Sequence, residues 1–169
     1  MTDGFVLSRG AGEAAGGNAL LAGVAHGAAG STFESVVSPG FDVGAHVHAG
    51  VQEIFYVIEG ELDLLAFEPR VRTAEGWSRW ESRDGRHVVR AGPGSFMFVP
   101  AGCPHAFSNP GPAPARMVFQ TIPAGHEQYL RELSGLFRPG SPPDAEAVAE
   151  LRRRHDIEQL TPMQFVRPA

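Results

Sequence analysis

Residues 40–53 read GFDVGAHVHAGVQE, a β-rich run that carries two histidines and a glutamate. On a strand, side chains two residues apart leave the same face, so His46 and His48 point together, with Cα atoms roughly 6.5 to 7 Å apart. Glu53 follows His48 by an odd number of residues and would face the other way on an unbroken strand. Gly50 allows the chain to turn between them. The spacing therefore predicts a hairpin that brings three ligands from two adjacent strands to one metal ion.

A fourth ligand is expected from residues 94–109, which read GSFMFVPAGCPHAFSN. A β-run ends at Pro100, Gly102 permits a tight turn, and His105 begins the return strand, from which it can point into a barrel. Imidazole and carboxylate are ordinary ligands for first-row divalent metals. We therefore expect one divalent transition metal (Fe, Mn, Ni, Co, Cu or Zn) bound by four side chains: His46, His48, Glu53 and His105.

The remainder of the chain has the composition of an all-β fold. Its 21 Gly and 14 Pro separate short apolar runs, as turns separate strands. The 169 residues suffice for a single domain with its own core. We divide that domain into N-terminal strands with a Gly/Ala-rich connection (1–30), a β-barrel (31–123) and a C-terminal helical appendage (124–169). The predicted strands are 5–7, 20–24, 32–38, 41–48, 53–58, 61–67, 87–90, 95–99, 105–108 and 116–122.

Two helices are predicted in the C-terminal appendage. The second begins with Asp144 as its N-cap and carries Val148 and Leu151 on one face. The first ends before Pro139 and is defined by apolar residues at helical spacing, namely Tyr129, Leu130, Leu133, Leu136 and Phe137.

Residues 68–86 are polar and predict a long hairpin extension. The two tryptophans within it, Trp77 and Trp80, are expected to fill a satellite cluster, because large aromatic residues mostly serve packing. The lone Cys103 has no base partner in the sequence and is expected to be inert. Four histidines outside the two stretches are expected to be surface or packing residues and not ligands: His26, His87, His126 and His155.

Composition excludes several classes of function. The net charge is −5, and the only basic run is Arg152 to Arg154, so neither a nucleic acid nor a membrane is expected as a partner. The chain has no lysine, which excludes Schiff-base chemistry and pyridoxal phosphate anchoring. One cysteine cannot form an intrachain disulfide, and no stretch approaches the ~20 apolar residues that span a bilayer. We expect a soluble, cytoplasmic protein.

Through the motifs in residues 40–60 and 94–109 the chain resembles the cupin superfamily, and Pro39 and the helical tail after Pro123 are similar to those of small single-domain quercetinase-like cupins. The resemblance implies a double-stranded β-helix, or jelly-roll barrel, with the metal bound inside it and with C-terminal helices. It also implies a homodimer. The first cupin motif is filled by Gly40, His46, His48, Glu53 and Gly60, and the second by Gly94, Pro100, Gly102, His105 and Asn109.

Four protein ligands leave one or two positions open on a five- or six-coordinate ion, which is typical of catalysis or ligand capture. A small-molecule substrate with adjacent oxygens, such as a flavonol, a diketone or a polyketide-like compound, can chelate there as an enolate. Glu53 is a candidate general base as well as a ligand. Phe55 and Phe107 lie two residues beyond Glu53 and His105, so they should face inward and bind the substrate.

We expect a metal-dependent dioxygenase similar to quercetinases. Two alternatives stay open: a non-oxidative metal-dependent isomerase, cyclase or decarboxylase, and a cupin that binds a small molecule without turnover.

Overall fold

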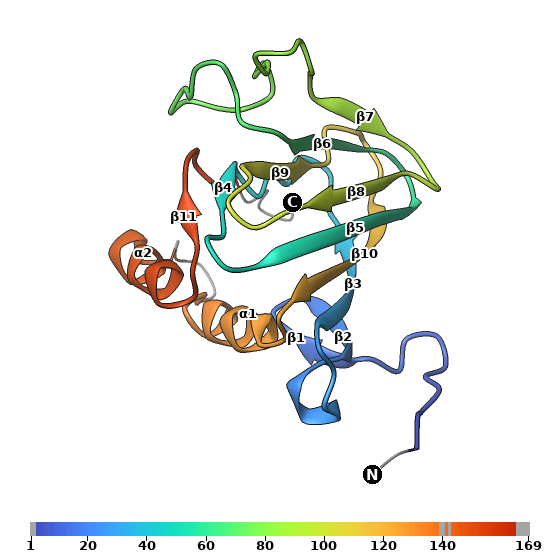
Figure 1. Ribbon diagram of the computed structural model, residues 1–169. Coiled ribbons are helices and arrows are strands. Elements are labelled where there is room, and N and C mark those ends of the chain that lie inside the picture. Colours follow the sequence, from blue (N-terminus) through green and yellow to red (C-terminus); the bar gives the residue numbers. More distant parts are fainter. Residues whose placement is uncertain (1–2, 139–140, 142, 165–169) are drawn as a thin grey trace.

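The computed structural model describes residues 3–138, 141 and 143–164, which form two antiparallel sheets and two helices (Figure 1). The larger sheet has the order β1-β2-β3-β10-β5-β8, and the smaller sheet the order β11-β4-β9-β6-β7. This arrangement confirms the predicted all-β class and jelly-roll architecture. The strands of the larger sheet are β1 (Glu13–Ala15), β2 (Asn18–Ala22), β3 (Ser31–Val37), β5 (Gln52–Glu59), β8 (Phe96–Val99) and β10 (Ala115–Ile122). Those of the smaller sheet are β4 (His46–Val47), β6 (Leu62–Ala66), β7 (Val89–Ala91), β9 (His105–Ser108) and β11 (Glu158–Gln159).

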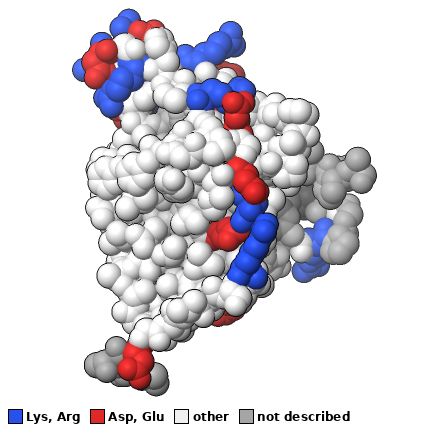
Figure 2. Space-filling view, turned by 90° about the vertical axis from the view of Figure 1, so that its right-hand side faces the viewer, with Lys and Arg blue, Asp and Glu red and all other residues white. Residues whose placement is uncertain are grey.

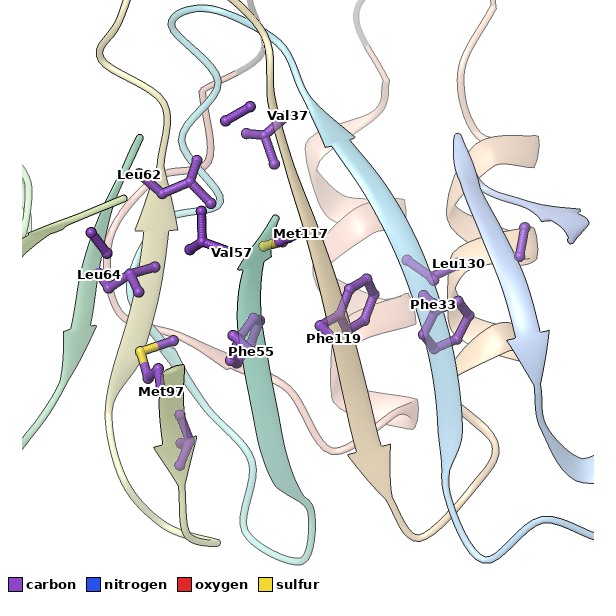
Figure 3. Close-up of a cluster of buried hydrophobic side chains, with 14 of the residues drawn as sticks. Phe33, Val37, Phe55, Val57, Leu62, Leu64, Met97, Met117, Phe119 and Leu130 are labelled. Carbon is purple, nitrogen blue, oxygen red and sulfur yellow. The ribbon is translucent and has the colours of Figure 1, made fainter. Parts of the chain in front are cut away.

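Period-two burial explains why these segments form strands with one face in the core. In β10 every second residue is buried, from Ala115 to Thr121, and the neighbouring strands β3 and β5 alternate in the same way. Figure 3 shows the inward side chains of these strands, with Met117 near Val57 and Phe119 near Phe55. Each such apolar side chain contributes about 1.5–3 kcal/mol by leaving water. The core therefore lies between the two sheets.

Two motif residues have structural roles at the turns. Gly60, between β5 and β6, has φ 72°, and a Cβ there would lie 2.9 Å from the Cα of Ala115. The amide of Asn109 donates to the carbonyls of Val37 and Ala113 at 2.8 and 2.9 Å. Its oxygen accepts from the backbone N–H of Gly111 at 2.9 Å. Both residues therefore hold the end of the barrel that is remote from the clustered histidines.

The extension at 68–86 folds back on itself through isolated antiparallel bridges, such as the one between Pro69 and Ser82. Trp77 and Trp80 are buried in a satellite cluster with Ala45, Leu65, Phe67 and Ala106, which confirms their predicted packing role. Because Leu65 alternates with the inward-facing Leu64, this cluster lies on the outer face of the smaller sheet. The extension thus covers a face that would otherwise be exposed.

The N-terminal prediction was partly wrong. Residues 5–7 form no strand, and Phe5, Val6 and Leu7 are exposed, because no described strand pairs with them and the sheet begins at β1. The strand predicted at 41–48 is shorter than expected. Only β4 and a bridge at Asp42 pair, because Gly44 between them has φ 71°, outside the extended range of a strand; a Cβ at this position would collide with Gln159 and Thr161.

The predicted helices are present as α1 (His126–Gly135) and α2 (Ala145–Arg154), and a 3-10 turn lies at Val24–His26. Asp144 caps α2 as predicted, and its carboxylate accepts from the backbone N–H of Glu146 at 2.8 Å. The first helix ends earlier than predicted, at Gly135, so Leu136 is its C-cap and Phe137 lies beyond it; Pro139 itself falls outside the described residues. No helix in the described part of the chain is long and apolar enough to cross a bilayer.

The outer face of the larger sheet is largely apolar. Tyr56, Phe96 and Phe98 alternate with inward-facing residues and are 47%, 61% and 48% exposed. Figure 2, which views the molecule from the right-hand side of Figure 1, shows a broad surface with few charged side chains. The homodimer implied by the resemblance stays a prediction.

Replacing Asn109 by Ala should lower the free energy of unfolding by about 2–3 kcal/mol, because two carbonyls and one N–H lose their buried partner. Urea denaturation followed by circular dichroism measures the change. The matched control is Asn18→Ala in the turn between β1 and β2, where the amide makes two long bonds of 3.3 Å. Equal losses in the two variants would show that Asn109 does not hold this end of the barrel.

Candidate metal centre

Four side chains converge inside the barrel: His46, His48, Glu53 and His105. Each offers one donor atom, these atoms lie within 4.8 Å of one another, and all four residues are buried. His46 and His105 are direct cross-strand partners in the smaller sheet, on β4 and β9. Glu53 reaches the same point from β5 of the larger sheet. The predicted hairpin of adjacent strands is therefore wrong, because β4 and β5 belong to different sheets and the cluster bridges them.

Hydrogen bonds to backbone carbonyls fix the orientation of all three histidine rings. The Nδ1 atoms of His46, His48 and His105 lie 2.9, 2.8 and 3.0 Å from the carbonyl oxygens of Gly44, Asp156 and Cys103, respectively. A carbonyl only accepts, so each Nδ1 carries the proton in the neutral ring, and each Nε2 keeps its lone pair for a metal.

The cluster fits a metal ion. The Nε2 atom of His48 is buried without a hydrogen-bond partner among the described residues, which costs about 1–3 kcal/mol unless something else binds it. The same atom lies 3.6 Å from Oε1 of Glu53, and Nε2 of His105 lies 2.7 Å from Oε2. Three imidazole nitrogens and one carboxylate suit the divalent transition metals from Mn to Zn.

The electrostatics of the metal-free cluster centre on Glu53 and His105. Burial alone would raise the pKa of Glu53, but the charges of His105 and His48 hold that pKa well below its usual value. Burial acts to lower the pKa of His105, yet the neighbouring Glu53 raises it. The pKa values of His46 and His48 are lowered, chiefly by burial and also by the charge of His105. Without metal, these shifts favour an ionised Glu53 beside a His105 ring that is protonated on both nitrogens.

Residues 156–161 support the cluster from far along the chain. Asp156 has φ 57°, its carbonyl accepts from His48, and its carboxylate accepts from the N–H groups of Ala49 and Gly50 at 3.0 and 2.8 Å. In β11, Gln159 pairs with His46. These supports were absent from the sequence prediction, because no local pattern links Asp156 to a strand more than a hundred residues earlier.

A cavity of about 410 Å³ opens onto the cluster, with His46 and Glu53 in its lining. Phe55 and Phe107 also line it, together with Phe119. Phe119 is the cross-strand partner of both Phe33 and Phe55, and its ring stacks on theirs with centroid distances of 4.7 and 6.0 Å (Figure 3). Glu53 is the only carboxylate of the described chain in this lining, and no arginine reaches it. The cavity is therefore mostly apolar and aromatic, and its uncharged polar lining away from the cluster includes Asn18, Ser35, Ser38 and Ser134.

His126 was predicted to be a surface or packing residue, but it also lines this cavity. It lies outside the four-residue cluster, as expected, but it lines the cavity, and its ring centroid is 5.9 Å from that of His48. Burial lowers the pKa of His126 to about 4, against an opposing effect of Glu53. Helical spacing predicted α1 but not which part of it faces the barrel.

The other candidates lie away from the cavity. His26 and His87 are exposed, and Nε2 of His155 lies 3.3 Å from Oε1 of Glu132. Cys103 is partly buried, and burial raises the pKa of its thiol, which agrees with the inert role expected for it.

Comparison with known proteins gives one family match. The model of the Cupin_2 family, described as "Cupin domain", matches residues 33–121. No curated protein matches the chain.

Similar solved structures include the protein TT1209 from Thermus thermophilus, at 26% identity over 56% of this chain and 72% of that one, with a TM-score of 0.43. An oxalate decarboxylase, assigned by prediction, from Thermotoga maritima is similar at 22% identity over 62% and 77%, with a TM-score of 0.48. The polyketide cyclase RemF from Streptomyces resistomycificus is similar at 24% identity over 62% and 63%, with a TM-score of 0.47.

Zinc binding to the metal-free protein should release a proton at pH values below the raised pKa of His105, because Nε2 of His105 must lose the proton that Glu53 stabilises. The raised pKa of His105 means that affinity should increase as the pH rises through that value. Calorimetric titration in two buffers of different ionisation enthalpy measures the proton count. Binding without proton release would contradict the charge state derived above.

Asp156→Val should weaken zinc binding about 10- to 100-fold, because a β-branched residue resists the positive φ that aims the carbonyl at His48. Asp156→Gly allows the same backbone conformation and removes only the hydrogen bonds of the carboxylate, so zinc affinity should fall less than in Asp156→Val. Competition with a chromogenic chelator measures both affinities. The control is Asp144→Ala, which removes the α2 cap far from the cluster; an equal effect there would refute a specific role for Asp156.

Proposed function

The chain belongs to the Cupin_2 family of cupin domains, and from that premise we propose that it is a metal-dependent enzyme of the dioxygenase type, acting on an uncharged, enolisable small molecule. The observation that carries the proposal is the position of the His/Glu cluster at the wall of an apolar, aromatic cavity. A closed structural site would have no need of such a cavity.

The four clustered side chains would hold the ion, the three histidines through Nε2 and Glu53 through its carboxylate. A divalent transition metal bound there supplies a Lewis acid that lowers the pKa of a chelated enol and, when the ion is redox-active, access to the chemistry of O₂. The carbonyls of Gly44, Asp156 and Cys103 hold the rings before any ligand arrives, so little reorganisation accompanies binding.

Glu53 is the group we assign to accept the enol proton. It is the only carboxylate in the lining of the cavity formed by the described residues, and the charges of His105 and His48 lower its pKa, which favours the ionised form. Its low pKa belongs to the metal-free chain, in which protonated His105 lies beside it. If Nε2 of His105 binds an ion, it no longer carries a proton. The basicity of Glu53 would then depend on the ion and on the other residues that bind it.

The walls of the cavity support the choice of substrate class. Phe55, Phe107 and Phe119 present rings at one side, which suits a flat, largely apolar molecule and keeps water away from an enolate. No arginine lines the described cavity, and the chain has no lysine, so a phosphate ester or a dicarboxylate would lack a counter-charge beyond the metal. A flavonol, a diketone or a polyketide-like compound meets these conditions.

One observation favours the non-oxidative alternative, an isomerase, cyclase or decarboxylase. His126 lies in the same cavity but outside the four-residue cluster, which places a second group capable of hydrogen bonding and proton exchange near the substrate. Reactions that move protons without O₂ commonly use such a pair.

Protein purified without chelator or affinity nickel should contain about one equivalent of Fe, Mn, Co, Ni or Cu and should consume oxygen with flavonols or β-diketones. His48→Ala should lose both the metal and the uptake while keeping its fold, because it removes one of four ligands. Elemental analysis and an oxygen electrode make the two measurements, and exposed His87→Ala is the matched control.

Metal with product formation but without oxygen uptake would replace the dioxygenase by the non-oxidative alternative. Metal without any product would leave a small-molecule-binding protein. A His48→Ala variant that kept full metal would refute the assignment of the cluster.

A further inference from the structure

His126 places a polar ring, without a hydrogen bond among the described residues, in a mostly aromatic part of the cavity wall. Its ring packs against Phe33 and Phe119, with centroid distances of 6.2 and 6.3 Å, and against Tyr129 at 5.2 Å. Among the described residues, no side chain or backbone group forms a hydrogen bond with its imidazole nitrogens. A phenylalanine would fill this position in the packing equally well, so packing alone does not account for the imidazole. The nitrogens of His126 are not among the fully buried unpaired atoms, so water or a ligand in the cavity supplies their partner.

The position of His126 is fixed by the residue that follows it. Glu127 is buried at the start of α1, and its carboxylate accepts from Ser31 and from the backbone N–H groups of Val24 and Gly125, the latter two at 2.8 and 3.2 Å. These bonds tie the first turn of α1 to β3 and to the 3-10 turn. His126 is therefore held on a rigid element, as a recognition residue requires.

His126 lies close enough to the cluster to contact what binds there, without belonging to it. Its ring stands edge-on to His48 with a centroid distance of 5.9 Å, yet it is not among the residues whose donor atoms converge within 4.8 Å. As the first residue of α1 it sits at the positive end of the helix dipole, which disfavours a charged imidazole. A neutral ring has one N–H donor and one acceptor.

We propose that His126 binds the substrate directly, donating a hydrogen bond from its imidazole to an oxygen of the ligand held at the four-residue cluster. The inference rests on the proposed function and narrows its substrate class. The substrate carries, on an uncharged flat ring system, an oxygen acceptor on the side that faces α1. His126 then selects among chelating molecules, and the phenylalanine wall accepts their rings.

The test uses zinc-loaded protein, in which no redox turnover occurs, and 3-hydroxyflavone as the probe. The absorbance of the chelated flavonolate reports the dissociation constant. His126→Phe should weaken probe binding about 10- to 100-fold, because the lost hydrogen bond is to an oxygen of the flavonolate, which becomes anionic when the probe is chelated. His126→Gln keeps an N–H donor and should recover most of this loss. Both variants should keep one zinc, and exposed His87→Phe should bind the probe like the wild type.

Equal probe binding by the wild type and His126→Phe would overturn the inference and leave the proposed function standing. Loss of zinc from either His126 variant would also overturn it, because His126 would then support the metal and not the substrate. A zinc-loaded wild type that fails to bind the probe would instead refute the substrate class of the proposed function, and the inference with it.

If His126→Phe does not fold, nitrogen-15 NMR of the wild type tests whether His126 binds the probe directly. Zinc alone should shift the Nε2 resonances of the three histidine ligands and leave the ring of His126 nearly unchanged. Addition of 3-hydroxyflavone should then shift the N–H of His126. A ring that responds to zinc alone, or that does not respond to the probe, would refute direct substrate binding.

Discussion

Three backbone carbonyls orient the histidine rings of the cluster, so that their Nε2 atoms point into the barrel. Gly44, Asp156 and Cys103 each accept a hydrogen bond from Nδ1 of a histidine, so the Nε2 atoms turn toward the carboxylate of Glu53. The pairing of Glu53 with His105 and the fit of the cluster to a transition metal follow from that orientation. Rotated rings would leave the same four residues unable to share one ion.

Sequence periodicity predicted the directions of side chains well and the positions of strands less well. Two-residue spacing places His46 with His48 and Glu53 with Phe55, and these pairs do face the interior. The same reasoning assigned β4 and β5 to one hairpin, whereas they lie in different sheets, because spacing along a chain carries no information about which sheet a strand joins. The cupin motifs imply which sheet each strand joins, because they are tied to a known strand topology, whereas local periodicity gives only the direction of each side chain.

The features that sequence reasoning did not find depend on contacts between distant segments. Phe119 joins the aromatic row only through the register of β10 against β3 and β5, and His126 reaches the cavity only because Glu127 anchors α1 to β3. Conversely, the apolar residues 5–7 look like a strand but have no neighbour to pair with among the residues described. A strand is stable only when it is hydrogen-bonded to a neighbouring strand, so a short apolar run alone is weak evidence for a strand.

The hydrogen bond from His48 to Asp156 joins residues 108 positions apart. During synthesis on the ribosome, all four clustered residues therefore emerge long before the carbonyl that orients one of them. A nascent chain that ends before Asp156 has its donor atoms but lacks the support for His48. The ring of His48 therefore gains its backbone support only after the segment that follows α2 has returned to the barrel and β11 has paired with β4.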